Sequence, residues 1–158
     1  MSNEHHFLLQ RVQPAMVGLI DGSLSTLAPI FGIAFYTHKP HAAFIAGLAT
    51  AIGAAISMAY SEGLSDTGEL TGRGHPFVRG AITGGGTFVG GILRTLPFLI
   101  PTYHAAVVTA AAVVAVELIG LAALRWRYFE TSFAVSLLHI TLGGGVIAGV
   151  GMLVGSAG

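Results

Sequence analysis

Residues 103–124 read YHAAVVTAAAVVAVELIGLAAL and contain one charged side chain, Glu117. At 1.5 Å of rise per residue, a helix of about 22 residues is long enough to cross the hydrocarbon core of a bilayer. The stretch is preceded by Pro101 and followed by RWRYFE, an aromatic and basic cluster typical of a membrane interface. It therefore predicts a transmembrane helix.

The rest of the chain has the same character. Of its 158 residues, 53% are hydrophobic and 9% are charged, whereas a soluble domain carries about 25% charged residues. We predict an all-α polytopic membrane protein, a bundle of five transmembrane helices that forms a single transmembrane domain over residues 1–158. Pro29 predicts a kink in the first helix. The predicted spans cover approximately residues 14–36, 41–62, 77–100, 103–124 and 131–154.

Several classes of protein are disfavoured by the composition. The formal net charge is zero, so there is no basic field for nucleic acid. The absence of cysteine excludes disulfides and thiolate metal sites. The first residues, MSNEHHFLLQRVQP, do not resemble a cleaved signal peptide. The 23 glycines recur inside apolar runs without a following GK[ST], which favours close helix packing over a phosphate loop.

The basic residues predict an orientation. The segments before span one, between spans two and three and between spans four and five hold five of the seven Lys and Arg residues. The other side has Lys39 in its loops, with Arg94 near that end of span three. By the positive-inside rule, the N-terminus is cytoplasmic and the C-terminus is outside. The short loops favour a bacterial inner (plasma) membrane. The five basic residues on the cytoplasmic side are Arg11, Arg73, Arg79, Arg125 and Arg127.

Ionisable groups inside spans are candidates for function because burying them in lipid is costly. Asp21, Glu117 and His139 all fall about 10 Å from the cytoplasmic edge, with Met58 slightly shallower. Glu117 and His139 are candidates for proton coupling or secondary polar roles; the alternative for His139 is a hydrogen-bonded interior histidine. Arg94 is offset from Glu117 by about 12 Å of helical rise, which argues against a direct ion pair.

A second pattern follows the end of span two. Met58, Glu62, Asp66 and Glu69 are spaced i, i+4, i+8 and i+11, so a continuous helix places them on one face. A divalent cation or a proton would relieve the repulsion among the three carboxylates. The stripe is interpreted as a path for a cation from the cytoplasm; the alternative is a solvated helix end. A thioether beside carboxylates favours a first-row transition metal such as Fe²⁺, unless Met58 only packs.

At these residues the sequence resembles the vacuolar iron transporter family. Residues 18–34, GLIDGSLSTLAPIFGIA, are similar to that family's D-G-x-x-[ST]-T pattern followed by a glycine. Residues 53–65, GAAISMAYSEGLS, resemble its S-M-x-x-x-E signature. The end of span three, GILRTLPFLI, is similar to its glycine-rich third helix that closes in a Leu-Pro pair. Five spans with the N-terminus inside also match the family.

The resemblance implies export of Fe²⁺, and often Mn²⁺, from the cytosol in exchange for protons. It implies a homodimer with the pathway along an interface formed by the first two helices. Asp21 matches the first-helix acid, and Met58 and Glu62 match the second-helix methionine and acid. Plant and fungal members carry a metal-binding insertion after the second helix, where this chain has only GLSDTGELTGRGHPF. Asp66 and Glu69 are interpreted as a reduced version of that insertion.

The predicted function is therefore metal transport with no resident cofactor, with protons, the bilayer and a second copy of the chain as partners. An enzyme is not expected, because a di-iron bundle needs repeated Glu-x-x-His pairs and Glu117 and His139 form none. Two alternatives remain. One is a non-transporting membrane assembly subunit, which explains the glycines but not Asp21. The other is a small cation or proton channel.

Overall fold

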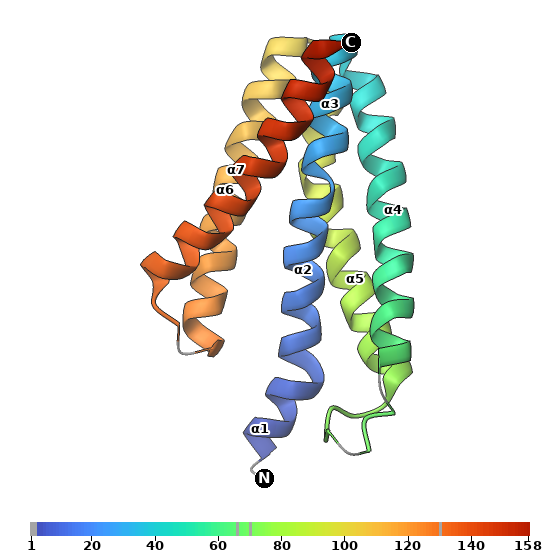
Figure 1. Ribbon diagram of the computed structural model, residues 1–158, viewed down its shortest axis with the longest axis vertical. Helices are drawn as coiled ribbons and strands as arrows, with labels where there is room; N and C mark the ends of the chain where they lie inside the picture. Colours follow the sequence, from blue (N-terminus) through green and yellow to red (C-terminus); the bar gives the residue numbers. More distant parts are fainter. Residues whose placement is uncertain (1–2, 66, 70, 130) are drawn as a thin grey trace.

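The computed structural model of the protein describes residues 3–65, 67–69, 71–129 and 131–158. Every regular element within these residues is a helix, which confirms the all-α prediction. A π-helical turn over Leu8–Val12 leads into α2, and a 3-10 turn over Leu96–Leu99 follows α5. The α-helices are α1 (Asn3–Phe7), α2 (Gln13–Ser25), α3 (Leu27–Thr37), α4 (Pro40–Ser65), α5 (Pro76–Thr95), α6 (Tyr103–Phe129) and α7 (Phe133–Ala157). Helices α2 and α3 lie end to end, and we call the two together the first rod. The first rod forms a bundle with α4, α5, α6 and α7 (Figure 1).

Four helical segments of the described chain are long and apolar enough to cross a membrane, Glu4–Thr37, Pro40–Ser65, Tyr103–Phe129 and Phe133–Ala157. The predicted third span, α5, is not among them. Its 20 residues still correspond to about 30 Å of helix, and it packs against both α2 and α4 (Figure 1). A helix covered by protein need not be apolar all round. This enclosure explains the polar residues of α5 that are at most 1% exposed, Arg79, Thr83, Thr87, Arg94 and Thr95.

Glycines let α5 approach its two neighbours closely. A Cβ atom on Gly22 of α2 would lie 1.9 Å from the carbonyl oxygen of Thr87. On the other side of α5, a Cβ on Gly80 would lie 2.5 Å from the carbonyl oxygen of Ala59 in α4. Within a membrane the hydrophobic effect does not drive helices together, because lipid is as apolar as their side chains. Helices associate there through close packing, including backbone contact of this kind. The packing interpretation is thus confirmed for these glycines.

Three buried threonines satisfy their hydroxyl groups with carbonyl oxygens of the preceding helical turn. The Oγ1 atoms of Thr26, Thr87 and Thr95 donate to carbonyl oxygens four residues earlier, at 2.9 Å, 3.0 Å and 3.0 Å. Such bonds to the preceding turn let a polar side chain lie in an apolar setting without a partner on another helix. They explain how a threonine-rich helix such as α5 can sit inside the bundle.

The first rod is interrupted at Thr26, which separates α2 from α3. Pro29 has no N–H group, so the carbonyl of Ser25 loses the helical bond that residue 29 would otherwise donate. Helical bonding resumes with the Ile30 N–H donating to the Thr26 carbonyl at 3.1 Å. The predicted kink is therefore confirmed, one turn before the proline.

The two chain ends lie at opposite ends of the bundle, as an odd number of spans requires (Figure 1). The α4–α5 and α6–α7 connections lie at the same end as the N-terminus. We call this the N-terminal end. It therefore gathers the basic residues that flank these segments, including Arg11, Arg73 and Arg127. The connection between α3 and α4, which contains Lys39, lies at the other end, with the C-terminus.

The contact between α2 and α5 makes a prediction about stability. Gly22→Ala places a methyl group against the backbone of Thr87, and we expect a loss of about 1–3 kcal/mol in the free energy of unfolding. Gly85→Ala is the matched control, because a Cβ there meets nothing within 4 Å. Unfolding of both purified variants in detergent, monitored by circular dichroism, measures the difference. Equal stability of the two variants would contradict the packing assignment.

Candidate functional site

Asp21 lies in the middle of the first rod, partly buried, on α2. The contacts made by its neighbours on α2 indicate the side of the helix on which Asp21 lies. Gly18 and Gly22 face the backbone of α5, while Met16 and Ile20 pack in a cluster with residues of α6 and α7. At 100° per residue, Asp21 falls on neither of these two sides of α2. None of the hydrogen bonds or ion pairs of the described chain involves its carboxylate.

Met58 lies partly buried on the facing helix, α4. It follows Gly47 by 11 residues, which is three helical turns, so both residues lie on one stripe of α4. Gly47 meets Ile30 of α3, and α3 continues the line of α2. Met58 therefore lies on the side of α4 that faces the first rod. Asp21 and Met58 thus lie on two helices, α2 and α4, that are in contact.

Glu62, one turn beyond Met58, is bound by two arginines. Its Oε1 accepts hydrogen bonds from Arg73 Nη2 at 2.6 Å and from Arg79 Nε at 2.9 Å. The Glu62 side chain is 13% exposed and that of Arg79 only 1%. A carboxylate held this way is a charge-assisted ion pair within the protein. Glu62 therefore lies in an ion-pair cluster with Arg73 and Arg79.

Arg79 also closes the C-terminal end of α4. Its Nη2 donates to the Glu62 carbonyl at 3.2 Å and to Ser65 Oγ at 3.1 Å. Its Nη1 donates to the Gly74 carbonyl at 3.3 Å. An arginine at a helix C-terminus satisfies carbonyls that have no partner in the helix. Sequence reasoning used Arg79 only for orientation, although an arginine inside a predicted span is itself a signal for a buried acidic partner.

The predicted acidic stripe does not continue beyond Glu62. The helix ends at Ser65, and Gly68 adopts φ of +81°, which is incompatible with a right-handed helix. Glu69 is consequently exposed on the connection to α5 rather than on a face of α4. Asp66 lies outside the described residues. The prediction that Glu69 shares one helical face with Met58 and Glu62 was wrong, because the spacing was counted past Ser65, where the helix ends.

Glu117 is paired with Arg94, contrary to the expectation of a separation. Arg94 Nε donates to Glu117 Oε2, and Arg94 Nη1 donates to the carbonyl of Ser23. The 12 Å offset assumed regular helix up to the turn. In the structure Leu96–Leu99 is a 3-10 turn, which rises about 2.0 Å per residue and places Arg94 deeper. The long arginine side chain covers the remaining distance. The pair thus ties α5 to α6 and to the backbone of α2.

His139 lies exposed on α7, and its Nδ1 is 2.8 Å from the carbonyl oxygen of Val135 in its own helix. It is not among the groups around Asp21 or Glu117. In the described part of one chain, no three His, Cys, Asp or Glu side chains come together as a metal site would require.

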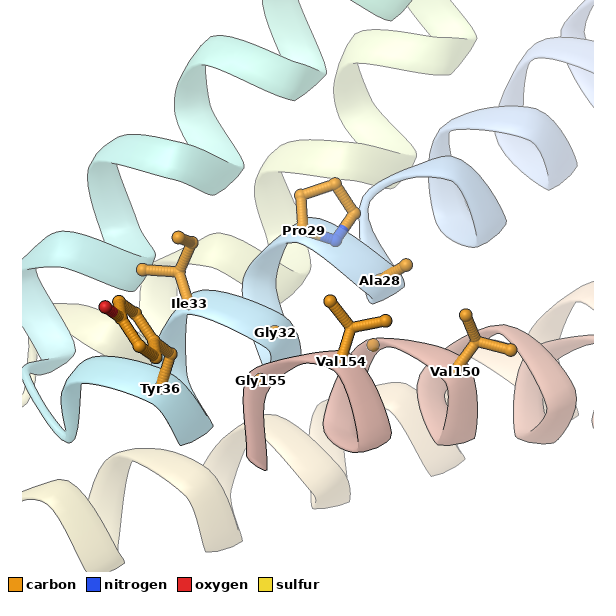
Figure 2. A pocket seen from close by; sticks show the side chains of 9 residues that line it. Ala28, Pro29, Gly32, Ile33, Tyr36, Val150, Val154 and Gly155 are labelled. Atoms are coloured by element: carbon orange, nitrogen blue, oxygen red, sulfur yellow. The ribbon is translucent and has the colours of Figure 1, made fainter. Parts of the chain in front are cut away.

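A surface groove between α3 and α7 lies in the half of the bundle away from the N-terminal end (Figure 2). It has a volume of about 390 Å³, and its lining includes Pro29, Tyr36 and Val154. Its lining holds no carboxylate, imidazole or thioether. The close approach of Gly151 and Gly155 to the backbone of α3 shapes its floor. The groove is a feature of helix packing, and the candidate ligands lie elsewhere.

Comparisons with known proteins identify the part of the chain that holds these ligands. No curated protein matches the chain, and no solved structure matches it. Residues 12–71 match the family model of the VIT family. The matched stretch includes α2, α3 and α4, and with them Asp21, Met58 and Glu62. The segment that carries the candidate residues is therefore similar to the VIT family, which agrees with the resemblance to the vacuolar iron transporters.

Proposed function

We propose that the protein transports a divalent transition metal, Fe²⁺ and also Mn²⁺, out of the cytosol in exchange for protons. The family match indicates a metal-ion transporter in the membrane; the ion, the direction and the coupling are the proposal. The observation that carries it is Asp21. It is an acid inside a membrane-crossing helix, in the family segment, with no cationic partner among the described residues.

The donors favour a transition metal. A carboxylate oxygen from Asp21 and a thioether from Met58 combine a hard and a softer ligand, a mixture that suits Fe²⁺ better than Mg²⁺ or Ca²⁺. Two donors do not fill the coordination sphere of such an ion, which takes about four ligands or more. A homodimer that brings the first rod and α4 of two copies together would double the set. This is the support for a second copy as partner.

Proton exchange supplies the driving force in this proposal. Moving a doubly charged ion out of a negative-inside cell costs about 4.6 kcal/mol per 100 mV. Carboxylates that bind metal when ionised and release it when protonated can couple the two fluxes. With the N-terminal end in the cytoplasm of a bacterial inner membrane, Asp21 would take metal from inside and a proton from outside. The basic residues at that end support this orientation.

Purified protein reconstituted into liposomes with an acidic lumen tests the proposal. External Fe²⁺ (kept reduced) or Mn²⁺ should enter as protons leave. Uptake should collapse when a protonophore dissipates the gradient, and Mg²⁺ and Ca²⁺ should be excluded. Flux that ignores the pH gradient would identify a channel instead. No flux from a folded, reconstituted protein would favour a membrane assembly subunit.

A further inference from the structure

Ser25 combines two oxygen atoms that lack their usual partners, at the point where the first rod is interrupted. Its Oγ atom is buried and has no hydrogen-bond partner among the described residues. Its carbonyl loses the helical bond of the next turn, because Pro29 has no N–H group. We propose that the hydroxyl and the carbonyl of Ser25 are ligands of the ion that Asp21 binds. The inference rests on the proposed function and deepens it by naming the neutral oxygen ligands of the same site.

The hydroxyl of Ser25 differs from that of the threonine beside it. Thr26 Oγ1 donates to the Gly22 carbonyl at 2.9 Å, the usual arrangement for a hydroxyl in an apolar helix. The equivalent bond from Ser25 Oγ would end on the carbonyl of Asp21, and the described chain does not make it. A buried hydroxyl without a partner is unfavourable. A cation at the lone pairs of Oγ would supply the missing partner.

The carbonyl of Ser25 stands out among the carbonyls at the end of α2. The Gly22 carbonyl accepts from Thr26 Oγ1, and the Ser23 carbonyl accepts from Arg94 Nη1. None of the side-chain hydrogen bonds of the described residues ends on the Ser25 carbonyl. Inside a membrane, carbonyls released by a break in a helix serve as ligands for cations, because no bulk water is present to bind them.

Helical spacing places Ser25 within reach of an ion at Asp21. The two residues are one turn apart on α2, which is continuous between them. Side chains at i and i+4 share a face, with Cβ atoms about 5–6 Å apart. Divalent cations hold oxygen ligands at about 2.0–2.6 Å, so one ion can bridge the two side chains. Ser25 thus adds two neutral oxygens, which suit Mn²⁺, without a further charge to bury in the membrane.

Titration calorimetry with Mn²⁺ on the full chain in detergent tests the hydroxyl. Ser25→Ala should raise the dissociation constant by about fivefold, the effect of losing one neutral polar contact. Ser156→Ala is the matched control, because the Ser156 hydroxyl donates to the Leu153 carbonyl of its own helix, α7, at 3.0 Å. That variant should bind Mn²⁺ with the wild-type affinity.

Pro29→Ala tests the carbonyl. Alanine restores the N–H group at residue 29, which can then donate to the Ser25 carbonyl and take it away from the ion. The dissociation constant for Mn²⁺ should therefore rise by about fivefold, while the helix content measured by circular dichroism does not fall. Weaker binding by a better-formed helix is not expected if Pro29 only shapes the fold. Wild-type affinity for Mn²⁺ in this variant would remove the carbonyl from the ligand set.

Ser25→Cys tests for direct contact with the ion, because the chain contains no cysteine and the new thiol would be unique. A thiolate prefers Cd²⁺ over Mn²⁺, so the ratio of the two affinities should shift toward Cd²⁺ by more than about tenfold. Ultraviolet absorption of the cadmium–thiolate bond should appear on binding and weaken in an Asp21→Asn background. Ser156→Cys should leave the ratio unchanged.

The outcomes separate this inference from the proposed function. Wild-type affinity in Ser25→Ala, or an unaltered metal preference in Ser25→Cys, would overturn the inference alone if the wild type transports metal. A folded wild type that neither binds nor transports metal would instead overturn the proposed function, and this inference with it.

Discussion

Replacement of Asp21 by Asn is expected to abolish metal-for-proton exchange, with a loss of more than about a hundredfold in the rate of Mn²⁺ uptake. Asparagine keeps the size of the side chain but removes the negative charge that holds the ion and the oxygen that takes the proton. Losing a charge-assisted interaction costs about 1.5–3 kcal/mol in binding alone, and loss of the proton carrier uncouples the cycle. Initial rates of uptake into liposomes with an acidic lumen measure the effect.

The same substitution should leave the fold intact, because no hydrogen bond or ion pair of the described residues depends on the Asp21 carboxylate. Glu4→Gln is the control, since it removes an exposed acid of α1 near the N-terminus. That variant should transport at the wild-type rate. Full exchange activity in Asp21→Asn would remove the central residue from the proposed mechanism.

Replacement of Glu117 by Leu should produce the largest loss of stability. Arg94 is 1% exposed, and without Glu117 its charge remains buried with only the Ser23 carbonyl as a partner in the described chain. Removing one partner of a buried ion pair costs about 3–5 kcal/mol. Denaturation in mixed detergent micelles, followed by circular dichroism, measures the free energy of unfolding.

The double variant Arg94→Met/Glu117→Leu separates the pair from the packing around it. It removes both charges and keeps the apolar volume, so its stability should return to within about 1–2 kcal/mol of the wild type. The coupling energy between Arg94 and Glu117 is calculated from the wild type, the two single variants and the double variant. It measures the interaction energy of the buried pair directly. If the single and double variants are equally destabilised, the loss reflects packing of the Glu117 side chain rather than an uncompensated charge.

The transmembrane architecture could be predicted from local properties of the chain. Apolar runs such as residues 103–124 need lipid around them wherever they are placed, and Pro29 disrupts a helix whatever its neighbours are. Asp21 was also selected as a candidate from the sequence, because an acid inside an apolar span is costly and therefore informative. The stretch that matches the VIT family, residues 12–71, includes Asp21 and Met58.

The side-chain partnerships could not be predicted in this way. Counting residues from span ends placed Arg94 and Glu117 apart, but a 3-10 turn and a long side chain brought them together. Counting through Gly68 extended the acidic stripe beyond the point where the helix ends. Both errors have one cause, which is that axial rise alone does not include backbone irregularity or side-chain reach.

What the sequence determined by itself is the kind of surroundings each segment requires: lipid for the apolar helices, water and headgroups for the basic ends, and close backbone contact for the glycines. Only the tertiary structure decided which charges meet. It enclosed the polar helix α5 between α2 and α4, and it placed Arg73 and Arg79 on Glu62 while leaving Asp21 without an ionic partner in the described chain. The physical reason is the distance along the chain between the residues on which each property depends. The preference for lipid or water depends on residues adjacent along the chain, whereas an ion pair depends on a few ångströms between residues that are distant in sequence.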